Sequence, residues 1–413
     1  MATSAQAVPS GQAHVAVVSF LAARAAPTGG FWLALAGGVA LARVAERRGA
    51  RLGFGASAAA MLETVAIIGP ARIGIPLTQA ATAPMLGRLE ARGWAAPSQV
   101  LACAAIRLVH NTATTAFFIW VITGGLDAYA GTYDALGRRV GLDVGTADAL
   151  VLTAIGLLAW SAFASTVQVL VYRRGLRLWD GTAAHATDVE HDNCAERQSH
   201  ETEAADWRRF DPRAVALAAG VAFVLLLAST SWLLLSAVAA WLAVAWIAAQ
   251  PDREPLPAGL VFAAILAGGA FIFTFGGGLG LDTALRRAAR AALLVLTATW
   301  LRGAAGAEGL REVSRRALGK FRRVPGAIEA GAVLDQLAAE GRLAAAGRTL
   351  ADKLTGVPKR PVPFLDAVLT WVVTESAEFK APPSPAKKTL RATARDWLLI
   401  ALAAAPALTL AYV

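Results

Sequence analysis

The sequence predicts an all-α, polytopic membrane protein with about eight or nine transmembrane helices and a helical cytoplasmic region. Residues 214–249 contain no charged residue. At about 1.5 Å of rise per residue, they are too long for one helix across a hydrocarbon layer of about 30 Å. Hydrophobic residues make up 56% of the chain and charged residues 16%, against about 25% charged residues in an average soluble domain. We therefore expect lipid to surround much of this protein.

Charge and cysteine content exclude several function classes. The formal net charge is +10, and basic residues between apolar runs fit the cytoplasmic loops of a membrane protein. We therefore expect no nucleic-acid partner. Cys103 and Cys194 are the only cysteines, too few for a disulfide framework or a zinc-finger array. Residues 1–11 lack the Lys or Arg that begins a cleaved signal peptide, so we expect the first spans to remain in the mature protein.

Apolar length and flanking charge predict the spans in chain order. The first stretch is interrupted by Arg24 and Pro27, so it is either one long span or a short re-entrant piece followed by a span. Residues 214–249 form a hairpin that turns near Ser229 and Ser231. The expected spans are residues 15–44, 54–84, 100–124, 147–171, two within 214–249, 256–275, 284–301 and 397–413.

The second stretch is irregular, because Pro70, Gly74 and Pro76 fall inside it. Proline removes a backbone donor and breaks the hydrogen-bond ladder of a helix. In lipid, such a break is tolerated where the backbone faces protein or a water-filled cavity. The pattern predicts a broken helix rather than a plain membrane anchor.

A few polar and ionisable side chains lie within apolar stretches. They are Glu63, Arg72, Arg107, His110 and Asn111. A charge in hydrocarbon costs a few kcal/mol, so such groups usually face a cavity or pair with one another. We expect them to line a substrate or ion pathway. The alternative is a structural Glu–Arg pair, or arginines that reach the membrane interface from the span ends.

The polar loop at residues 180–213 contains most of the histidines. His185, His191, Cys194 and His200 can all bind a divalent metal such as zinc, nickel or cobalt. Their spacing matches no fixed zinc motif. The loop is therefore either a divalent metal site near a transport pathway or a flexible, solvated linker, and no other cofactor is expected.

Residues 302–395 contain no run long enough to cross a bilayer, and the positive-inside rule places them in the cytoplasm. Their first part predicts a basic amphipathic helix. Its basic residues are Arg311, Arg315, Arg316, Lys320, Arg322 and Arg323. We expect this face to bind either a partner, such as a cytoplasmic ATPase or other membrane subunits, or the anionic headgroups of the lipid bilayer.

These observations divide the chain into five regions. They are an N-terminal membrane region with a broken second helix (1–179), the polar His/Cys loop (180–213), a second membrane region (214–301), the basic helical cytoplasmic region (302–395) and a C-terminal transmembrane helix (396–413).

The layout of residues 214–413 resembles the transmembrane T component, the scaffold, of energy-coupling factor transporters. A membrane hairpin, two further spans, a long basic helical region and a final span that begins Ala394-Arg-Asp-Trp-Leu-Leu follow in that order. The resemblance implies coupling to two ATPases through Ala-Arg-Gly-type triplets. The only exact triplet, Ala91-Arg92-Gly93, lies outside the similar region. Gly341-Arg342-Leu343 and Gly347-Arg348-Thr349 occupy the expected place with other residues.

The chain contains no nucleophile elbow, metalloprotease or nucleotide-binding motif, and residues 276–280 lack the Lys-Ser/Thr pair of a phosphate loop. We therefore expect no enzyme, and any ATP must be bound by a partner. The predicted function is transport of a small solute, with a metal ion or vitamin-like substrate favoured, by a permease or the membrane subunit of a larger transporter. The predicted location is the cytoplasmic (inner) membrane, with multiple passes. The alternatives are a non-transporting membrane scaffold that assembles partner proteins and an intramembrane enzyme.

Overall fold

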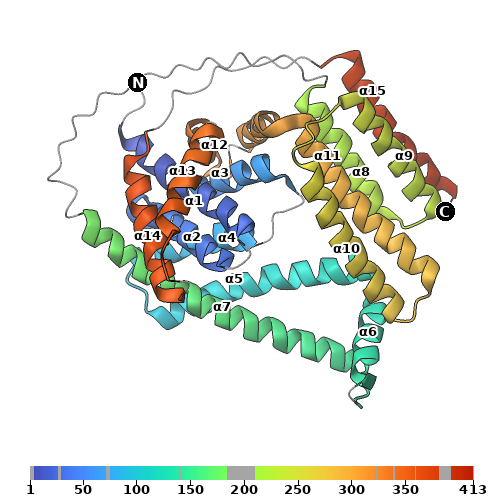
Figure 1. Ribbon diagram of the computed structural model, residues 1–413, viewed down its shortest axis with the longest axis horizontal. Coiled ribbons are helices and arrows are strands. Elements are labelled where there is room, and N and C mark those ends of the chain that lie inside the picture. The colour runs from blue at the N-terminus through green and yellow to red at the C-terminus, as the bar shows by residue number, and fades with distance from the viewer. Residues whose placement is uncertain are drawn as a thin grey trace.

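The computed structural model describes residues 4–26, 29–70, 75–139, 141–183, 210–321, 323–337, 340–358, 360–380 and 392–412. Every regular element in these ranges is helical, which confirms the all-α class (Figure 1). The elements are α1 Ser4–Ala25, α2 Gly30–Arg48, α3 Ala50–Ile68, α4 Ile75–Ala91, α5 Ala96–Phe117, a π turn Phe118–Thr123, α6 Leu126–Arg139, α7 Thr146–Ala183, α8 Pro212–Ala228, α9 Trp232–Ala249, α10 Leu256–Gly276, α11 Leu281–Lys320, α12 Ala327–Gln336, α13 Glu340–Leu354, α14 Pro361–Glu378, α15 Ala394–Ala404 and a 3-10 turn Ala405–Tyr412.

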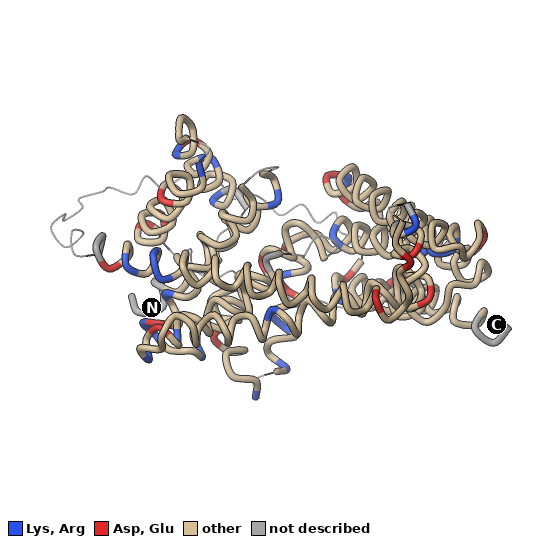
Figure 2. The backbone as a smooth tube through the Cα atoms, turned by 90° about the horizontal axis from the view of Figure 1, so that it is seen from below, with Lys and Arg blue, Asp and Glu red and all other residues tan. Residues whose placement is uncertain are grey.

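Five of these helices are long and apolar enough to cross a membrane. They are α3, α5 with its π turn, most of α7, α9 and α10, and α8 is a shorter apolar helix. Figure 2 shows charged residues in small groups, separated by long uncharged lengths of backbone. Membrane residence is supported by this length and composition. The predicted total of about eight or nine spans is not reached by the described helices, so the finer count stays a prediction.

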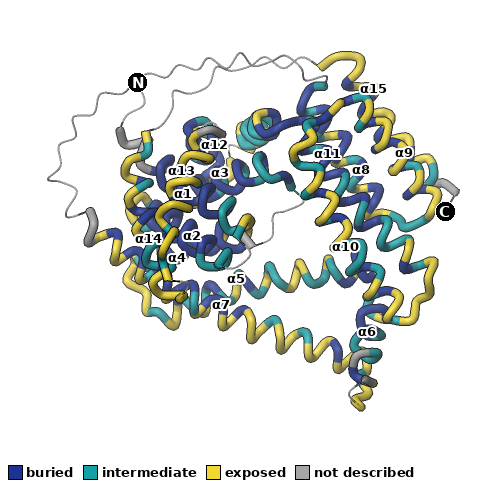
Figure 3. The backbone as a smooth tube through the Cα atoms, in the orientation of Figure 1, coloured by how far each residue is buried: buried dark blue, intermediate teal, exposed yellow. Residues whose placement is uncertain are grey.

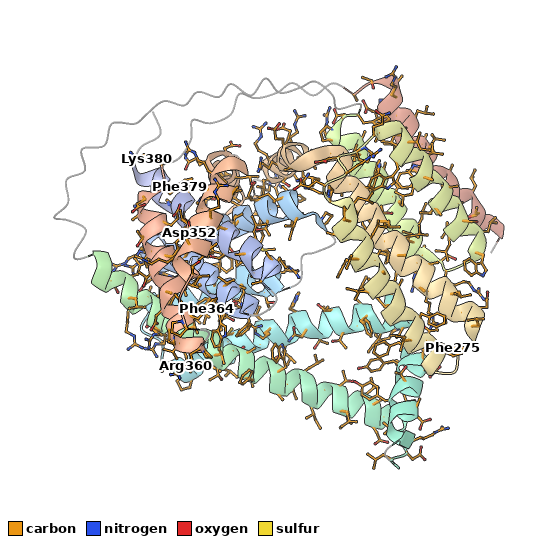
Figure 4. The ribbon with its side chains drawn as sticks, in the orientation of Figure 1. Phe275, Asp352, Arg360, Phe364, Phe379 and Lys380 are labelled. Atoms are coloured by element: carbon orange, nitrogen blue, oxygen red, sulfur yellow. The ribbon has the colours of Figure 1, made fainter. Side chains whose placement is uncertain are left out.

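The first predicted stretch is not one continuous helix, and the alternative of a re-entrant piece followed by a span stays a prediction. It forms two helices, α1 and α2, that pack against each other. Gly29 has a φ of +88°, a conformation that favours glycine, and the ring of Phe364 lies at this turn (Figure 4). A Cβ at Gly30 would lie 2.4 Å from the carbonyl oxygen of Ala23. The two glycines therefore allow a tight helical hairpin here.

Helices α1 and α2 form the core of a first helical body, and α3, α4, α7, α12, α13 and α14 pack around them. Residues 33–45 of α2 are all buried (Figure 3). Small residues allow this close approach. A Cβ at Gly87 of α4 would lie 1.9 Å from the carbonyl oxygen of Ala42 on α2.

Helices α8, α9, α10, α11 and α15 form a second body around its own apolar cluster. Trp241 and Trp300 meet edge to face in that cluster, with ring centroids 5.3 Å apart. Helix α8 ends at Ala228 and α9 begins at Trp232, so the hairpin turn predicted near Ser229 is confirmed. The Ser231 side chain caps α9 by accepting a hydrogen bond from the backbone N–H of Leu234, at 3.3 Å.

Helices α5 and α7 run side by side from the first body toward α6, which lies at the end of the second body (Figure 1). The outer faces of α5, its π turn and α7 are exposed (Figure 3), and they carry large apolar side chains. Those with more than half of their surface exposed are Leu101, Val109, Trp120, Val151, Leu152, Ile155, Leu158, Phe163 and Leu170. Exposed apolar surface of this extent is expected to contact lipid.

The eighth predicted span, residues 284–301, is part of a longer helix. Helix α11 continues to Lys320 through a kink at Gly306, whose φ of +65° is not helical. Beyond it, α12 packs on α3, and α13 and α14 pack on α1. The predicted basic region at 302–395 is therefore packed against the N-terminal helices in its described part. Its cytoplasmic location stays a prediction.

Candidate functional site

Polar side chains from three helices meet inside the first body, and we call them the Arg107 cluster. Helix α4 supplies Gln79 and Thr82, α5 supplies Cys103 and Arg107, and α7 supplies Gln168 and Tyr172. All six are buried. Arg107 is 4% exposed, although its charge would favour water.

Gln168 is at the centre of the cluster. Its Oε1 accepts hydrogen bonds from Arg107 Nη2, at 2.5 Å, and from Cys103 Sγ, at 3.2 Å. Its Nε2 donates to Thr82 Oγ1 at 2.7 Å, so one side chain of α7 connects α4 with α5. The Thr82 hydroxyl in turn donates to the carbonyl oxygen of Thr78, also at 2.7 Å.

Tyr172 extends the cluster toward α2. Its hydroxyl donates to Gln79 Oε1 at 3.0 Å. The same hydroxyl oxygen lies against Gly38 of α2, where a Cβ would be only 1.7 Å away. The missing side chain at Gly38 therefore leaves the space that this tyrosine occupies.

Helical spacing places each pair of side chains on one face. Cys103 and Arg107 are four residues apart, and so are Gln168 and Tyr172. Residues at this spacing are neighbours on the surface of a helix. Packing α4, α5 and α7 together therefore brings the pairs into contact.

The cluster has a positive charge without a neighbouring negative one. Among the described residues, no carboxylate pairs with Arg107. Its Nε is buried without an acceptor, and so is Nε2 of Gln79. An uncompensated buried charge costs several kcal/mol, which is unusual in a purely structural site.

The predicted pathway residues do not all come together. Asn111 lies one turn beyond Arg107 on α5 and donates from Nδ2 to Ser161 Oγ of α7 at 3.2 Å. His110 is half-buried on the same helix. Arg72 lies outside the described residues. Glu63 lies on α3 and belongs to a different contact.

Glu63 is fully buried and forms an ion pair with Arg311 of α11. The guanidinium donates from Nε to Oε2 at 2.6 Å and from Nη2 to Oε1 at 2.5 Å. Nearby, Arg302 Nε donates to the carbonyl oxygen of Ile67, near the C-terminal end of α3, at 2.7 Å. These contacts join α3 to α11, so the geometry of Glu63 fits the alternative of a structural Glu–Arg pair.

Three of the six predicted docking cations have described partners within the chain. Arg311 binds Glu63, and Arg315 and Arg316 both bind Glu312. Lys320 and Arg323 are exposed at and just beyond the end of α11. Arg322 lies outside the described residues. A docking role for this face stays a prediction, and its exposed part is the end that carries Lys320 and Arg323.

A cavity of about 730 Å³ lies between the two helical bodies. Its wall comes mainly from apolar residues of α1 and α13, with the end of α3 and the start of α10. Arg302 and Glu254 are the charged residues on it. Its volume is in the range of small-molecule sites. However, Arg302 already binds the α3 carbonyl, so the cavity offers less polar recognition than the Arg107 cluster.

The predicted metal residues His185, His191, Cys194 and His200 all lie outside the described residues. Within the described part of the chain, no three His, Cys, Asp or Glu side chains are grouped as a metal site would require. Metal binding at the loop stays a prediction.

Sequence analysis identified Arg107 but missed Gln79, Thr82, Gln168 and Tyr172. Gln168 could have been recognised from the sequence as a candidate site residue, because it is a large polar residue inside the apolar stretch 147–171. Gln79 and Thr82 followed the predicted break, where polar lining is expected. These side chains are neutral near pH 7, and a neutral polar residue in an apolar stretch is a weaker sign of a site than a charged one.

Comparisons of this chain with protein-family models, with curated proteins and with solved structures found no match. The resemblance to the T component of energy-coupling factor transporters therefore rests on layout alone.

Proposed function

We propose that this chain is an integral membrane transport protein, either a permease or the membrane subunit of a multi-component transporter. The observation that carries the proposal is Arg107, a buried cation without a described counter-ion on a helix of membrane-spanning length. Intramembrane charges are rare and usually mark a substrate or ion pathway. The Arg107 cluster is the proposed solute site.

The position of α4 supports the same proposal. Helix α3 ends at Ile68 and α4 begins at Ile75, so the second predicted span is divided into two helices. Gln79 and Thr82 lie on the first turns of the second helix and bind α7. Discontinuous helices commonly supply solute ligands near the middle of a membrane transporter.

We also propose that energy, if it comes from ATP, is supplied by a cytoplasmic partner. The sequence offers no nucleotide-binding motif. The exposed end of the basic face at Lys320 and Arg323 is the proposed contact for such a partner. The inner membrane is the proposed location.

Uptake by whole cells tests the transport proposal. Cells with and without the gene are compared for uptake of radiolabelled acetate, biotin and nickel(II). A solute taken up only with the gene present supports the proposal. Replacing Arg107 with Ala should then reduce that uptake at least about tenfold, because the buried guanidinium is lost. No difference for any labelled solute would count against transport.

The control variant is Arg138→Ala at matched expression. Arg138 lies on α6 and, among the residues that the structure describes, pairs with Asp134, one turn away, with 73% of its side chain exposed. Its loss should leave uptake unchanged. Equal losses in both variants would indicate that Arg107 has no special role.

A non-transporting scaffold is the second candidate. It is favoured by the wide apolar outer faces of α5 and α7, which could contact other membrane proteins as well as lipid. Purification in mild detergent separates the two candidates. Stoichiometric membrane partners, together with unchanged uptake of every labelled solute, would favour the scaffold.

A further inference from the structure

The hydrogen-bonding groups of the Arg107 cluster are unbalanced. Its acceptors are engaged, because Gln168 Oε1 accepts two hydrogen bonds and Gln79 Oε1 accepts one from Tyr172. Two donors are left without acceptors, Arg107 Nε and Gln79 Nε2. A buried donor without an acceptor costs about 1–3 kcal/mol, and more when it is charged. The missing partner is therefore an acceptor.

Charge narrows the chemical class of that partner. The cluster has one guanidinium and, among the described residues, no carboxylate to pair with it. A metal cation would be repelled by Arg107. A dianion such as phosphate would leave a surplus negative charge in a buried site. A monovalent anion compensates the guanidinium one to one.

Shape and size further restrict the chemical class of the bound anion. A guanidinium is a planar fork whose N–H groups match the two oxygens of a carboxylate. Gln79 offers a second donor from α4, which a carboxylate can accept on its remaining lone pairs. Gln79 and Gln168 have no exposed surface, so a group bound between them must be small and shielded from water.

We propose that the Arg107 cluster binds a small monovalent carboxylate, held by Arg107 from α5 and Gln79 from α4. This inference rests on the proposed function, since it names the chemical class of the transported solute. A carboxylate there bridges α4 and α5 and satisfies both free donors. Among the solutes predicted from the sequence, it favours a vitamin-like acid over a metal ion.

Thermal unfolding of the full-length protein in detergent tests this inference without relying on transport. The protein is titrated with sodium acetate, sodium chloride or sodium phosphate at constant ionic strength and pH. Acetate should raise the unfolding temperature in a saturable way, because a ligand that binds only the folded state stabilises it. Chloride and phosphate should have little effect. Equal stabilisation by chloride would overturn the carboxylate assignment, and no effect of acetate would overturn anion binding.

Two variants test whether acetate binds at the Arg107 cluster. Arg107→Gln should weaken the apparent affinity for acetate at least about tenfold, because the charge-assisted hydrogen bonds are lost. Gln79→Met keeps the charge and the side-chain length, removes one donor, and should weaken affinity by a smaller factor. It also provides an answer if Arg107→Gln does not fold. Arg138→Gln is the control and should bind acetate like the parent, and acetate binding unchanged in Gln79→Met would contradict the proposal.

The two proposals fail in different ways. Arg107-dependent stabilisation by acetate, without uptake of labelled acetate by proteoliposomes, would overturn transport of the anion and keep the binding site. Arg107-dependent uptake of nickel(II) or another non-carboxylate, without stabilisation by acetate, would overturn the carboxylate and keep transport.

Discussion

Arg107 and Arg311 carry the same charge in different surroundings. Arg311 makes two hydrogen bonds to the buried carboxylate of Glu63. Arg107 is bound by the neutral amide of Gln168. A charge paired in this way is typical of a structural contact, whereas an unpaired one is typical of a ligand site. We therefore assign a structural role to Arg311, and ligand recognition remains the proposed role of Arg107.

Replacing Glu63 with Gln should destabilise the protein by about 3–5 kcal/mol, because it breaks a buried ion pair by removing the carboxylate that accepts two hydrogen bonds from Arg311. Thermal or denaturant unfolding in detergent measures this. Arg51→Gln is the control. Arg51 pairs with Glu329 but is 63% exposed, so its loss should cost at most about 1 kcal/mol. Similar losses in the two variants would contradict a structural role specific to Glu63.

His14 predicts a pH dependence of stability. It is buried on α1 and stacks on Phe379, which directly follows α14 and is labelled in Figure 4, with ring centroids 4.6 Å apart. Helix α1 is not among the membrane-length apolar helices. Burial, with the nearby charge of Arg342, lowers the pKa of His14 from 6.5 to about 4. The unfolded state then binds a proton first as the pH falls. Stability should therefore fall by about 3 kcal/mol between pH 6.5 and pH 4.

Unfolding temperatures measured across this pH range check the His14 prediction. A His14→Phe variant keeps an aromatic ring against Phe379 and has no group to protonate. Its stability should change less over the same range. An identical pH profile for both proteins would show that another group is responsible.

At the scale of elements, boundaries were predictable where a local signal marked them. The α8–α9 turn follows from Ser229 and Ser231, and the starts of α7 and α10 agree with the predicted starts of their spans to within a residue. Arg24 and Pro27 predicted an interruption of the first stretch, and α1 ends at Ala25, but the glycines at 29 and 30 that shape the α1–α2 turn were not predicted. Helix α11 was ended too early at residue 301, because loss of hydrophobicity does not end a helix that has other contacts.

Close packing of α2 against α4 makes a further prediction at this scale. Gly87→Ala would place a methyl group 1.9 Å from the Ala42 carbonyl oxygen, so the two helices must separate. The expected destabilisation is about 1–3 kcal/mol or more.

Gly220→Ala on α8 is the matched control, since a Cβ there meets nothing within 4 Å. It should be neutral or stabilise by up to about 1 kcal/mol. Thermal unfolding of both variants in detergent decides the comparison, and equal stabilities would refute the close approach.

At the scale of the whole molecule, the most extensive feature is the exposed apolar surface of α5, α7, α9 and α10. Surface of this kind is stable in lipid and promotes aggregation in water. The protein should sediment with membranes, resist extraction by alkaline carbonate and require detergent for release. Fractionation followed by immunoblotting measures this. Recovery of a monodisperse protein from the aqueous fraction without detergent would contradict membrane residence.

The whole molecule also joins regions that the sequence separates. Helices α12, α13 and α14 follow the second membrane region in the chain but pack on α1, α2 and α3. The Glu63–Arg311 pair connects residues 248 positions apart. Such pairings depend on how helices assemble, and sequence periodicity carries no information about which distant helix a face will meet.

The sequence by itself determined that the chain is helical and apolar enough for a membrane, because both properties follow from local composition and run length. It also identified Arg107 as an unusual charge in an apolar stretch. Only the tertiary structure decided that Glu63 pairs with Arg311 and that Arg107 meets Gln168, since a partner in space is fixed by helix packing. The chemistry proposed for this protein depends on that second set of contacts, because a buried guanidinium becomes a recognition group only where packing leaves it without a carboxylate.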